Sequence, residues 1–514
     1  MKRPWTSPNL TQSTMLNAAS SLLNYGAGIV VVLLLSPFLL TQLGPTLFGT
    51  WKVCQRLLTY VSATDGRASQ ALKWTIANRR SVSNIEQKQR EIGCALVVWL
   101  RFLPLMLLAG GLLSWFSPNF IRGLPSEYHL VTRLTCAILV LNLLLHPLKS
   151  IPESVMVGMN LGYKTTWINA FSAIAGGLLM GAAVWIGWGL IGLASAFLVV
   201  SIIHGLAILY MTRKCLPWLA IRRPEQGEVS RFFSFSIWVL AWTFINKFLL
   251  ASDIVILGLV SSAPVVAAYT LTFYAIQTSV NLSAILVSSG MPGMGDIVGR
   301  GELKKAAAVR SEIMTSSWLL AVVIGTLILL WNRPFIALWV GAEQFVGYGE
   351  NFLMVMLMTQ LIFIRNDAFI VDVTLEIRTK VLLGALSTAV SLGLAILLGV
   401  YWQSSIAGVL IGLIAGRSIL SVLYPTLVRK SLRLNKEVSI EPTTNVIRLS
   451  IVMVVLYASA YYLAQLIKVN SWFELIYYAA FSSLFIFCIV FWIGFSGNQR
   501  RKMVFRARQI AFKR

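Results

Sequence analysis

Eight cationic side chains lie inside apolar segments of the sequence, where they could bind an anion. A Lys or Arg at mid-membrane costs about 2.5–3.5 kcal/mol on an insertion scale, so eight of them facing lipid would be prohibitive. They must face protein, water or a ligand, or reach an interface with their long side chains. In a wet cavity, Arg and Lys are suited to binding phosphate groups. The eight are Lys52, Arg56, Arg67, Arg101, Lys149, Lys247, Arg365 and Arg417.

Three of these cations share one predicted helix face with a phenol. Lys52 and Arg56 are four residues apart, and Tyr60 and then Arg67 continue the stripe at near-helical spacing. Residues three and four apart are neighbours on a helix surface. The stripe therefore predicts a positively charged face that could accept an anionic head group.

Five acids also lie within the apolar segments, and they allow two interpretations. If each acid neutralises a cation across a helix interface, the charges are structural; Lys149 with Glu153 and Arg365 with Asp372 have suitable spacing. Five acids cannot neutralise eight cations, which favours a cavity of positive potential. Asp65, with Arg67, is expected to fix a helix end or form a gate pair. Nothing in the sequence establishes ion coupling, but Asp253, Asp367 or Asp372 could serve it.

The composition predicts the elements that hold these residues. Of 514 residues, 57% are hydrophobic and only 12% charged, and the mean hydropathy is +0.76. A soluble chain averages about a quarter charged residues. A membrane-spanning helix needs about 20 apolar residues, which predicts an all-α polytopic membrane protein with fourteen spans. The spans are predicted at 16–43, 46–72, 94–115, 130–159, 165–186, 189–211, 231–260, 265–296, 315–339, 348–374, 381–401, 405–428, 446–467 and 472–495.

The loops between these spans predict the orientation. If both termini are cytoplasmic, the inner loops and tails carry 31 Lys and Arg residues and the outer loops only four. This alternation follows the positive-inside rule. Most of the net charge of +24 therefore orients the spans and does not indicate nucleic-acid binding. The basic tail, 497–514, is expected in the cytoplasm, either solvated or lying on anionic lipid as an amphipathic helix.

Several function classes lack their sequence signals. There is no P-loop ending in Gly-Lys-Ser/Thr, and the loops are too short for a soluble catalytic domain or for the large outer loop of a membrane polymerase. The three His residues lack metal-ligand spacing, and the five Cys are scattered. We therefore expect no enzyme activity, no cofactor and no metal.

Weak internal similarity predicts two lobes. Pro45 and Pro264 each follow an apolar span, and small residues and then Trp51 or Tyr269 come after them. This placement suggests two six-helix lobes around a central cavity, followed by two extra helices. The expected limits are 1–211 for the first lobe, 212–230 for a cytoplasmic linker, 231–436 for the second lobe, 437–496 for the extra helices and 497–514 for the tail.

The first 80 residues resemble the polysaccharide-flippase family of the multidrug/oligosaccharidyl-lipid/polysaccharide exporter superfamily. The similarity rests on Ser36-Pro37-Phe38-Leu39-Leu40, Leu43-Gly44, Phe48-Gly49, Trp51, Tyr60, Asp65-Gly66 and Ala71-Leu72. The family usually has an apolar residue between that Asp and Gly, followed by another Gly. This chain has Asp65-Gly66-Arg67-Ala68 and departs from the pattern there.

The resemblance implies a carrier in the bacterial cytoplasmic (inner) membrane. It would move an undecaprenyl-diphosphate-linked oligosaccharide to the outer leaflet for O-antigen, capsule or exopolysaccharide synthesis, by alternating access of the two lobes. Lys52 and Arg56 would contact the diphosphate from one lobe, and Lys247, Arg365 and Arg417 from the other, with Arg101 and Lys149 completing the cationic set. Expected partners are membrane lipids and the polymerase and glycosyltransferases of the same pathway, with no nucleic acid.

Other functions remain open at this stage. A flippase for the lipid-linked peptidoglycan precursor would also use a cationic cavity. A multidrug cation antiporter of the same superfamily would need an anionic or apolar one. A membrane glycosyl polymerase would need a large outer loop, and a scaffold without transport would give no reason for buried cations.

Overall fold

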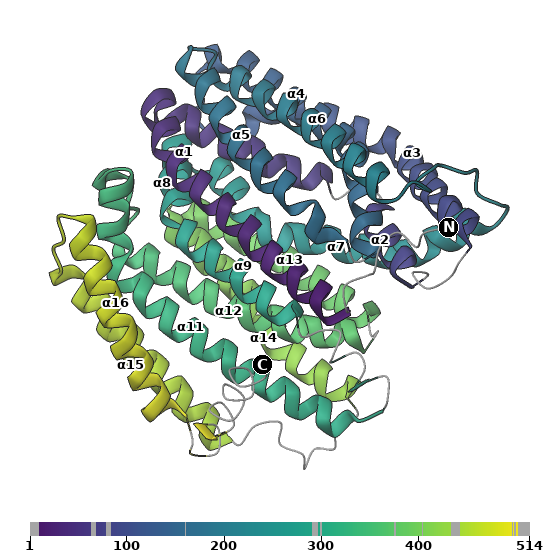
Figure 1. The fold of residues 1–514 in the computed structure, drawn as a ribbon. Helices are drawn as coiled ribbons and strands as arrows, with labels where there is room; N and C mark the ends of the chain where they lie inside the picture. Colours follow the sequence, from purple (N-terminus) through teal and green to yellow (C-terminus); the bar gives the residue numbers. More distant parts are fainter. Residues whose placement is uncertain are drawn as a thin grey trace. The chain divides into compact units, whose positions relative to one another are not determined.

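The computed structural model describes most of the chain. It covers residues 10–62, 68–78, 84–159, 161–289, 294, 297–298, 301–374, 377–402, 405–432, 443–495, 497 and 500–501. Within this described part the regular structure is helical and no strand forms (Figure 1). The long helices are α1 (Leu10–Val61), α2 (Ala68–Asn78), α3 (Ile85–Phe116), α4 (His129–Gly158), α5 (Thr166–Trp185), α6 (Gly189–Cys215), α7 (Glu228–Val260), α8 (Ala263–Thr272), α9 (Tyr274–Ser289), α11 (Leu303–Trp339), α12 (Tyr348–Val373), α13 (Ile377–Tyr401), α14 (Ile406–Ser431), α15 (Thr443–Leu466) and α16 (Trp472–Ile489).

The predicted fold class is confirmed: the chain is an all-α, multi-pass membrane protein. Each predicted span coincides with one or two helices. Among the described residues, 11 helices are long and apolar enough to cross a membrane, or up to 12 if a bent helix pair counts as one span. The count is lower than fourteen partly because α1 runs through two predicted spans. Helix α1 has a break at Gly44, whose φ of +72° is a conformation that favours glycine. Pro45 follows, and its ring is incompatible with a regular helix interior.

The first compact unit comprises Met1–Ala267. Helix α4 packs along α6, α6 along α5, and α5 along α1. Apolar side chains of α2, α3 and α4, including the fully buried Leu72, Ile76 and Val155, form a core beside them. Helix α7 belongs to this unit, since it packs on α1 and α3, although the sequence predicts that it opens the second lobe.

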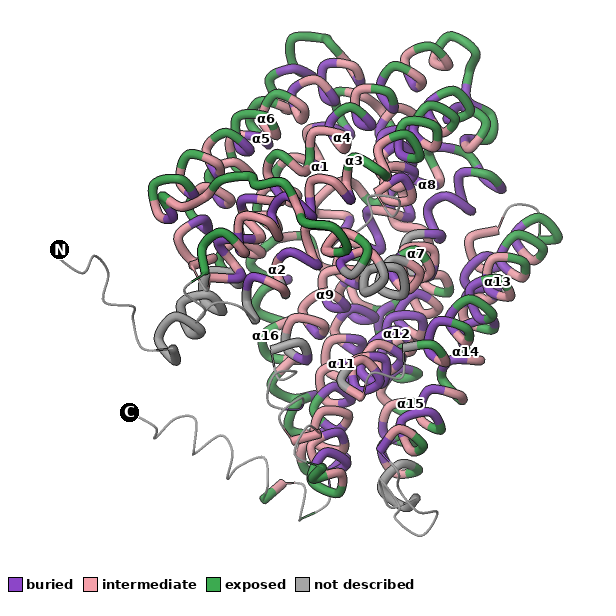
Figure 2. The backbone as a smooth tube through the Cα atoms, turned by 90° about the vertical axis from the view of Figure 1, so that its right-hand side faces the viewer, coloured by how far each residue is buried: buried purple, intermediate pink, exposed green. Residues whose placement is uncertain are grey.

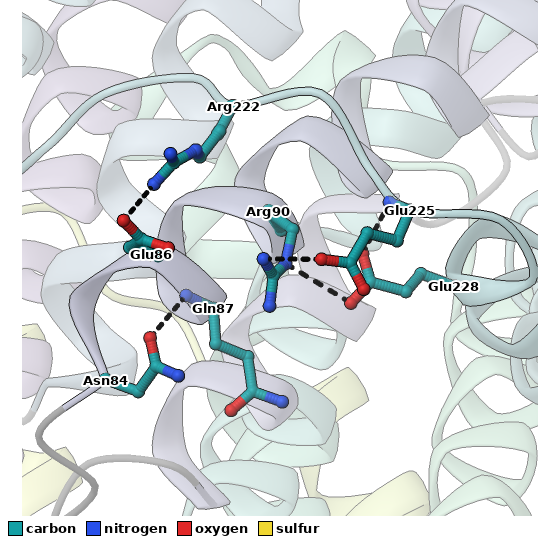
Figure 3. A network of polar contacts seen from close by, with 7 residues as sticks. All are labelled: Asn84, Glu86, Gln87, Arg90, Arg222, Glu225 and Glu228. Atoms are coloured by element: carbon teal, nitrogen blue, oxygen red, sulfur yellow. Dashed lines mark hydrogen bonds and ion pairs between the residues drawn. The ribbon is translucent and has the colours of Figure 1, made fainter.

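The connection from α6 to α7 is fastened to the first turns of α3 (Figure 3). Arg90 forms ion pairs with Glu225 at 2.7 Å and Glu228 at 3.4 Å, and Arg222 pairs with Glu86 at 2.6 Å. A Cβ atom on Gly93 would lie 2.0 Å from the Arg222 carbonyl oxygen, so only glycine permits this approach. The predicted linker is therefore packed against the first unit at this point.

The other end of α7 is also held by the first unit. The backbone N–H of Arg122 donates to the Gly258 carbonyl at 2.8 Å, and its guanidinium donates to the Val260 carbonyl at 3.1 Å. These bonds satisfy carbonyl groups at a helix C-terminus, which otherwise lack partners. Helix α7 is thus fixed at both of its ends to elements of the first unit.

The second compact unit comprises Ala268–Arg514 and has α12 at its centre. In its most apolar window, 72% of the α12 residues are buried, against 11% for α16 (Figure 2). Helices α13 and α14 approach closely, since a Cβ on Gly412 would lie 2.4 Å from the Ala395 nitrogen. Helices α15 and α16 pack on α11. The Tyr457 hydroxyl donates to the Ala321 carbonyl at 2.9 Å, which fixes α15 to α11.

Candidate functional site

The stripe predicted on one helix face lies on the second part of α1. Lys52 and Arg56 are both partly exposed, whereas the neighbouring Val53 and Cys54 are buried, so the stripe is on the accessible side of the helix. The Lys52 ammonium nitrogen lies 5.0 Å from the centroid of the Phe48 ring, a cation–π contact. Neither cation has an acid within ion-pair distance among the described residues.

Aromatic rings from α7 complete this surface. Tyr60 stacks on Phe248 with ring centroids 4.4 Å apart, and Phe248 in turn contacts Phe244 at 4.8 Å. Arg56 precedes Tyr60 by four residues on α1, so the cation and the ring stack are neighbours on one helix face. Lys247, next to Phe248 in the chain, is also partly exposed. We call Lys52, Arg56, Tyr60, Lys247 and Phe248 the α1–α7 cluster.

The predicted gate residues have different environments. Asp253 is 4% exposed and lies on α7, the helix that carries Lys247 and Phe248 of the cluster. Asp65 and Arg67 lie outside the described residues. Of the predicted gate and coupling groups in the first unit, the structure therefore places Asp253 beside the α1–α7 cluster.

Asp367 in the second unit forms an ion pair with Arg310, which the sequence predicts to lie in a loop. Arg310 of α11 donates to the Asp367 carboxylate of α12 at 2.6 and 2.8 Å, and both side chains are more than 90% buried. Arg310 was expected in a cytoplasmic loop. Helix α11 begins at Leu303, so Arg310 lies two turns inside the helix and on its buried side, where the carboxylate neutralises the cation. Lys304 and Lys305 in the first turn remain exposed.

Asp372 is likewise paired, but not with Arg365. The Lys380 ammonium of α13 lies 2.5 Å from the Asp372 carboxylate, and the Lys380 side chain is only 1% exposed. Lys380 was also expected in a loop. Arg365, which is aligned with Asp372 along α12, has no acid within ion-pair distance among the described residues. Arg365 is partly exposed, whereas Arg417 of α14 is 2% exposed.

The remaining two predicted cations are in the first unit. Arg101 is on the exposed side of α3. Lys149 is partly exposed on α4, and in the described part no ion pair of 4.0 Å or less joins it to Glu153, its expected partner. Glu153 instead accepts a hydrogen bond from Asn169 at 3.1 Å. The structure thus places Lys52 and Arg56 on one accessible face, Arg101 on the exposed side of α3, and Lys149 without its expected ion pair to Glu153.

Sequence reasoning missed the aromatic partners and the two buried cations. Phe244 and Phe248 are four residues apart on a predicted helix, a spacing that could have indicated an aromatic face. No local signal marks Arg310 or Lys380 as buried, because each lies beside, rather than inside, an apolar run. Within the described residues, no three His, Cys, Asp or Glu side chains are placed to hold a metal ion.

Comparison with solved structures shows which fold this arrangement belongs to. No protein-family model matches the sequence, and no curated protein sequence is similar to it. The structure of the lipid II flippase MurJ in an inward closed conformation matches with a TM-score of 0.67 and 12% identity, over 92% of this chain and 97% of that one.

Other transporters of the MOP superfamily have similar structures. An inward-facing MATE family transporter of the MOP superfamily matches with a TM-score of 0.59 and 14% identity, over 81% of this chain and 99% of that one. A MOP superfamily transporter from Pyrococcus furiosus matches with a TM-score of 0.55 and 13% identity, over 82% and 94%. This chain has the MOP fold. At identities this low, the structural matches establish the fold alone. The cargo has to be inferred from the chemistry of the site.

Proposed function

We propose that the chain is a flippase that carries a lipid-linked oligosaccharide with a diphosphate group across the bacterial cytoplasmic membrane. The observation that carries this proposal is the α1–α7 cluster, in which Lys52 and Arg56 have no acid partner in the described part. A diphosphate bears about two negative charges at neutral pH, and its transfer through hydrocarbon is very costly. Two adjacent cations lower that cost by forming charge-assisted hydrogen bonds to the phosphate oxygens.

The stacked rings beside these cations suit the rest of such a cargo. Tyr60 and Phe248 present flat apolar faces next to Arg56, and ligand sites typically combine such surfaces with a few charged groups. Lys247, Arg365 and Arg417, together with Arg101 and Lys149, would supply further positive charge. The MOP fold supports transport by alternating access. The excess of Lys and Arg in alternate loops supports cytoplasmic termini. The cargo would serve O-antigen, capsule or exopolysaccharide synthesis, alongside the polymerase and glycosyltransferases of that pathway.

A second cargo is favoured by one comparison. The chain and the lipid II flippase MurJ align over nearly their whole lengths, which supports the lipid-linked peptidoglycan precursor as the alternative. The MATE comparison would support a multidrug antiporter, but an unpaired pair of cations repels cationic drugs. A polymerase or other enzyme receives no support from these structural neighbours, which are described as transporters.

The experiment compares two arginine variants in a deletion strain of the host. Arg56→Ala should abolish surface polysaccharide and leave lipid-linked repeat units in the inner leaflet, while the protein still reaches the membrane. The matched control is Arg133→Ala, because Arg133 stacks on Trp115 at 4.4 Å at the start of α4 and is remote in sequence from the cluster. Normal polymer with Arg56→Ala would refute the role of the cluster. Rescue of a strain depleted of MurJ would assign the peptidoglycan cargo instead.

A further inference from the structure

A chain of three hydrogen-bonded polar side chains links three helices of the first unit. It joins α4, α5 and α6, which pack side by side (Figure 1). The His204 Nε2 atom lies 2.7 Å from the Asn169 Oδ1 atom, and the Asn169 amide donates to the Glu153 Oε1 atom at 3.1 Å. His204 is 8% exposed, so its ring lies within the helix bundle. Intramembrane ionisable groups are costly and usually serve a function.

The hydrogen bonds in this chain all run in one direction. Because the Asn169 nitrogen donates to Glu153, its oxygen faces His204 and can only accept. The His204 Nε2 atom must therefore carry a hydrogen. The described part shows no hydrogen bond to the other ring nitrogen, Nδ1. Nδ1 is thus the atom at which a proton can be added while every bond of the chain is kept.

The electrostatic surroundings of the ring are simple. Lys149, one turn before Glu153 on α4, acts on His204 and on Glu153 through its charge, without a direct ion pair. Helix α5 contributes no titratable group. The other titratable side chains on the elements packed around α6 are Tyr25, Lys52, Cys54, Arg56 and Tyr60 of α1, His129, Arg133, Cys136 and His146 of α4, and Tyr163 and Lys164 of the turn before α5. Lys149 is the charged group that acts on the His204 ring.

We propose that His204, Asn169 and Glu153 form a proton-binding site inside the first unit. His204 takes a proton from water at Nδ1 and becomes an imidazolium, while its Nε2–H continues to donate to Asn169. The carboxylate of Glu153 stabilises this charge through the polarised amide. In the neutral state Glu153 balances Lys149 alone; in the protonated state two cations share one carboxylate. Proton uptake therefore adds a second positive charge near the one carboxylate of Glu153.

The first test observes the ring directly. The sequence has only three His residues, so His129→Gln with His146→Gln leaves His204 as the single histidine. In lipid nanodiscs, ¹⁵N NMR of labelled His204 should show Nδ1 gaining a proton as the pH is lowered from 7 to 3, because the burial of the ring and the nearby Lys149 cation both oppose the added charge, while Nε2 stays protonated. Glu153→Gln should weaken proton binding by about threefold or more, since half a unit of titration midpoint corresponds to that factor. Glu127→Gln, in the turn before α4, is the control and should leave the titration in place.

A second measurement separates a proton site from a purely structural polar contact. His204→Gln keeps a donor for Asn169 but binds no proton. Hydrogen exchange of the amides in α4, α5 and α6 should depend on pH in the native protein and lose that dependence in His204→Gln. The proposal is overturned if Nδ1 keeps one protonation state over the whole range, if Glu153→Gln leaves the titration unchanged, or if His204→Gln exchanges like the native protein at every pH. No cargo is used, so these outcomes are independent of the proposed function.

Discussion

The paired acids of the second unit differ from the cations of the α1–α7 cluster, although Arg365 in the second unit also has no acid within ion-pair distance among the described residues. In the second unit, the acids Asp367 and Asp372 each meet a buried cation, at 2.6 and 2.5 Å. In the first unit, Lys52 and Arg56 are four residues apart on an accessible face and have no acid within ion-pair distance among the described residues. A buried charge is tolerated when it is paired, whereas an accessible unpaired one retains its capacity to bind a ligand. The difference separates charges that join helices from charges available to a cargo.

The largest expected effect on transport comes from introducing an acid beside Arg56 in the first unit, so that it forms an ion pair like those of the second unit. Thr59→Asp places an acid three residues from Arg56 on the same helix face. Losing one charge-assisted hydrogen bond costs about 1.5–3 kcal/mol, so transport by this variant should fall about tenfold or more. The amount of surface polysaccharide, compared at equal membrane levels of the protein, measures transport. Thr59→Asn has the same size without the charge and should retain transport; equal loss in both variants would argue against neutralisation of Arg56.

Breaking a pair in the second unit should lower stability. Asp367→Asn leaves Arg310 buried without a counter-ion, and breaking a buried pair from one side costs about 3–5 kcal/mol. The midpoint of thermal unfolding in detergent should fall accordingly. Adding Arg310→Gln removes the stranded charge and should recover part of the loss. Unchanged stability of Asp367→Asn would show that this pair does not hold α11 to α12.

A neutral buried group in the same unit should have a smaller effect. The Tyr457 hydroxyl donates to the Ala321 carbonyl at 2.9 Å and lies 3.0 Å from the Thr359 hydroxyl. Tyr457→Phe keeps the ring but removes both contacts; because the Thr359 hydroxyl still donates to the Val355 carbonyl at 2.9 Å, the cost is that of lost hydrogen bonds, about 0.5–1.5 kcal/mol in the free energy of unfolding. Tyr461→Phe is the matched control, because the structure shows ring contacts but no hydrogen bond for its hydroxyl. A larger loss in the control would contradict this assignment.

The ion pairs at the surface of the first unit should contribute least. Arg90 pairs with Glu225, whose side chain is 65% exposed. Exposed pairs contribute about 0–1 kcal/mol and are screened by salt. Arg90→Ala should therefore shift the unfolding midpoint far less than Asp367→Asn does, and the shift should vanish at high ionic strength. Arg90→Lys keeps the charge and should behave like the native protein. A salt-independent loss as large as that of Asp367→Asn would remove the distinction between surface and buried pairs.

Hydropathy was sufficient to predict the fold class because each span requires a long apolar run. It could not place Arg310 or Lys380, since both lie in polar flanks that a window assigns to loops, and their burial depends on acids of another helix. The spacing of Lys52, Arg56 and Tyr60 is a local signal, and it predicted that the three side chains share one helix face. In the structure all three lie on α1 at that spacing. The stacking of Tyr60 on Phe248 joins residues far apart in the chain, and no periodicity within one segment could indicate it.

The attachment of α7 at both ends has a consequence for dividing the gene. A break within 216–227 would put α7 on the second fragment, although its packing partners α1 and α3 and its contacts with Arg90 and Arg122 are on the first. A break after Ser262 would keep those partners on one polypeptide. Two co-expressed fragments divided after Ser262 should therefore reassemble, whereas fragments divided in the 216–227 segment should be degraded. The natural module boundary would then follow the seventh long helix and not the polar stretch that precedes it.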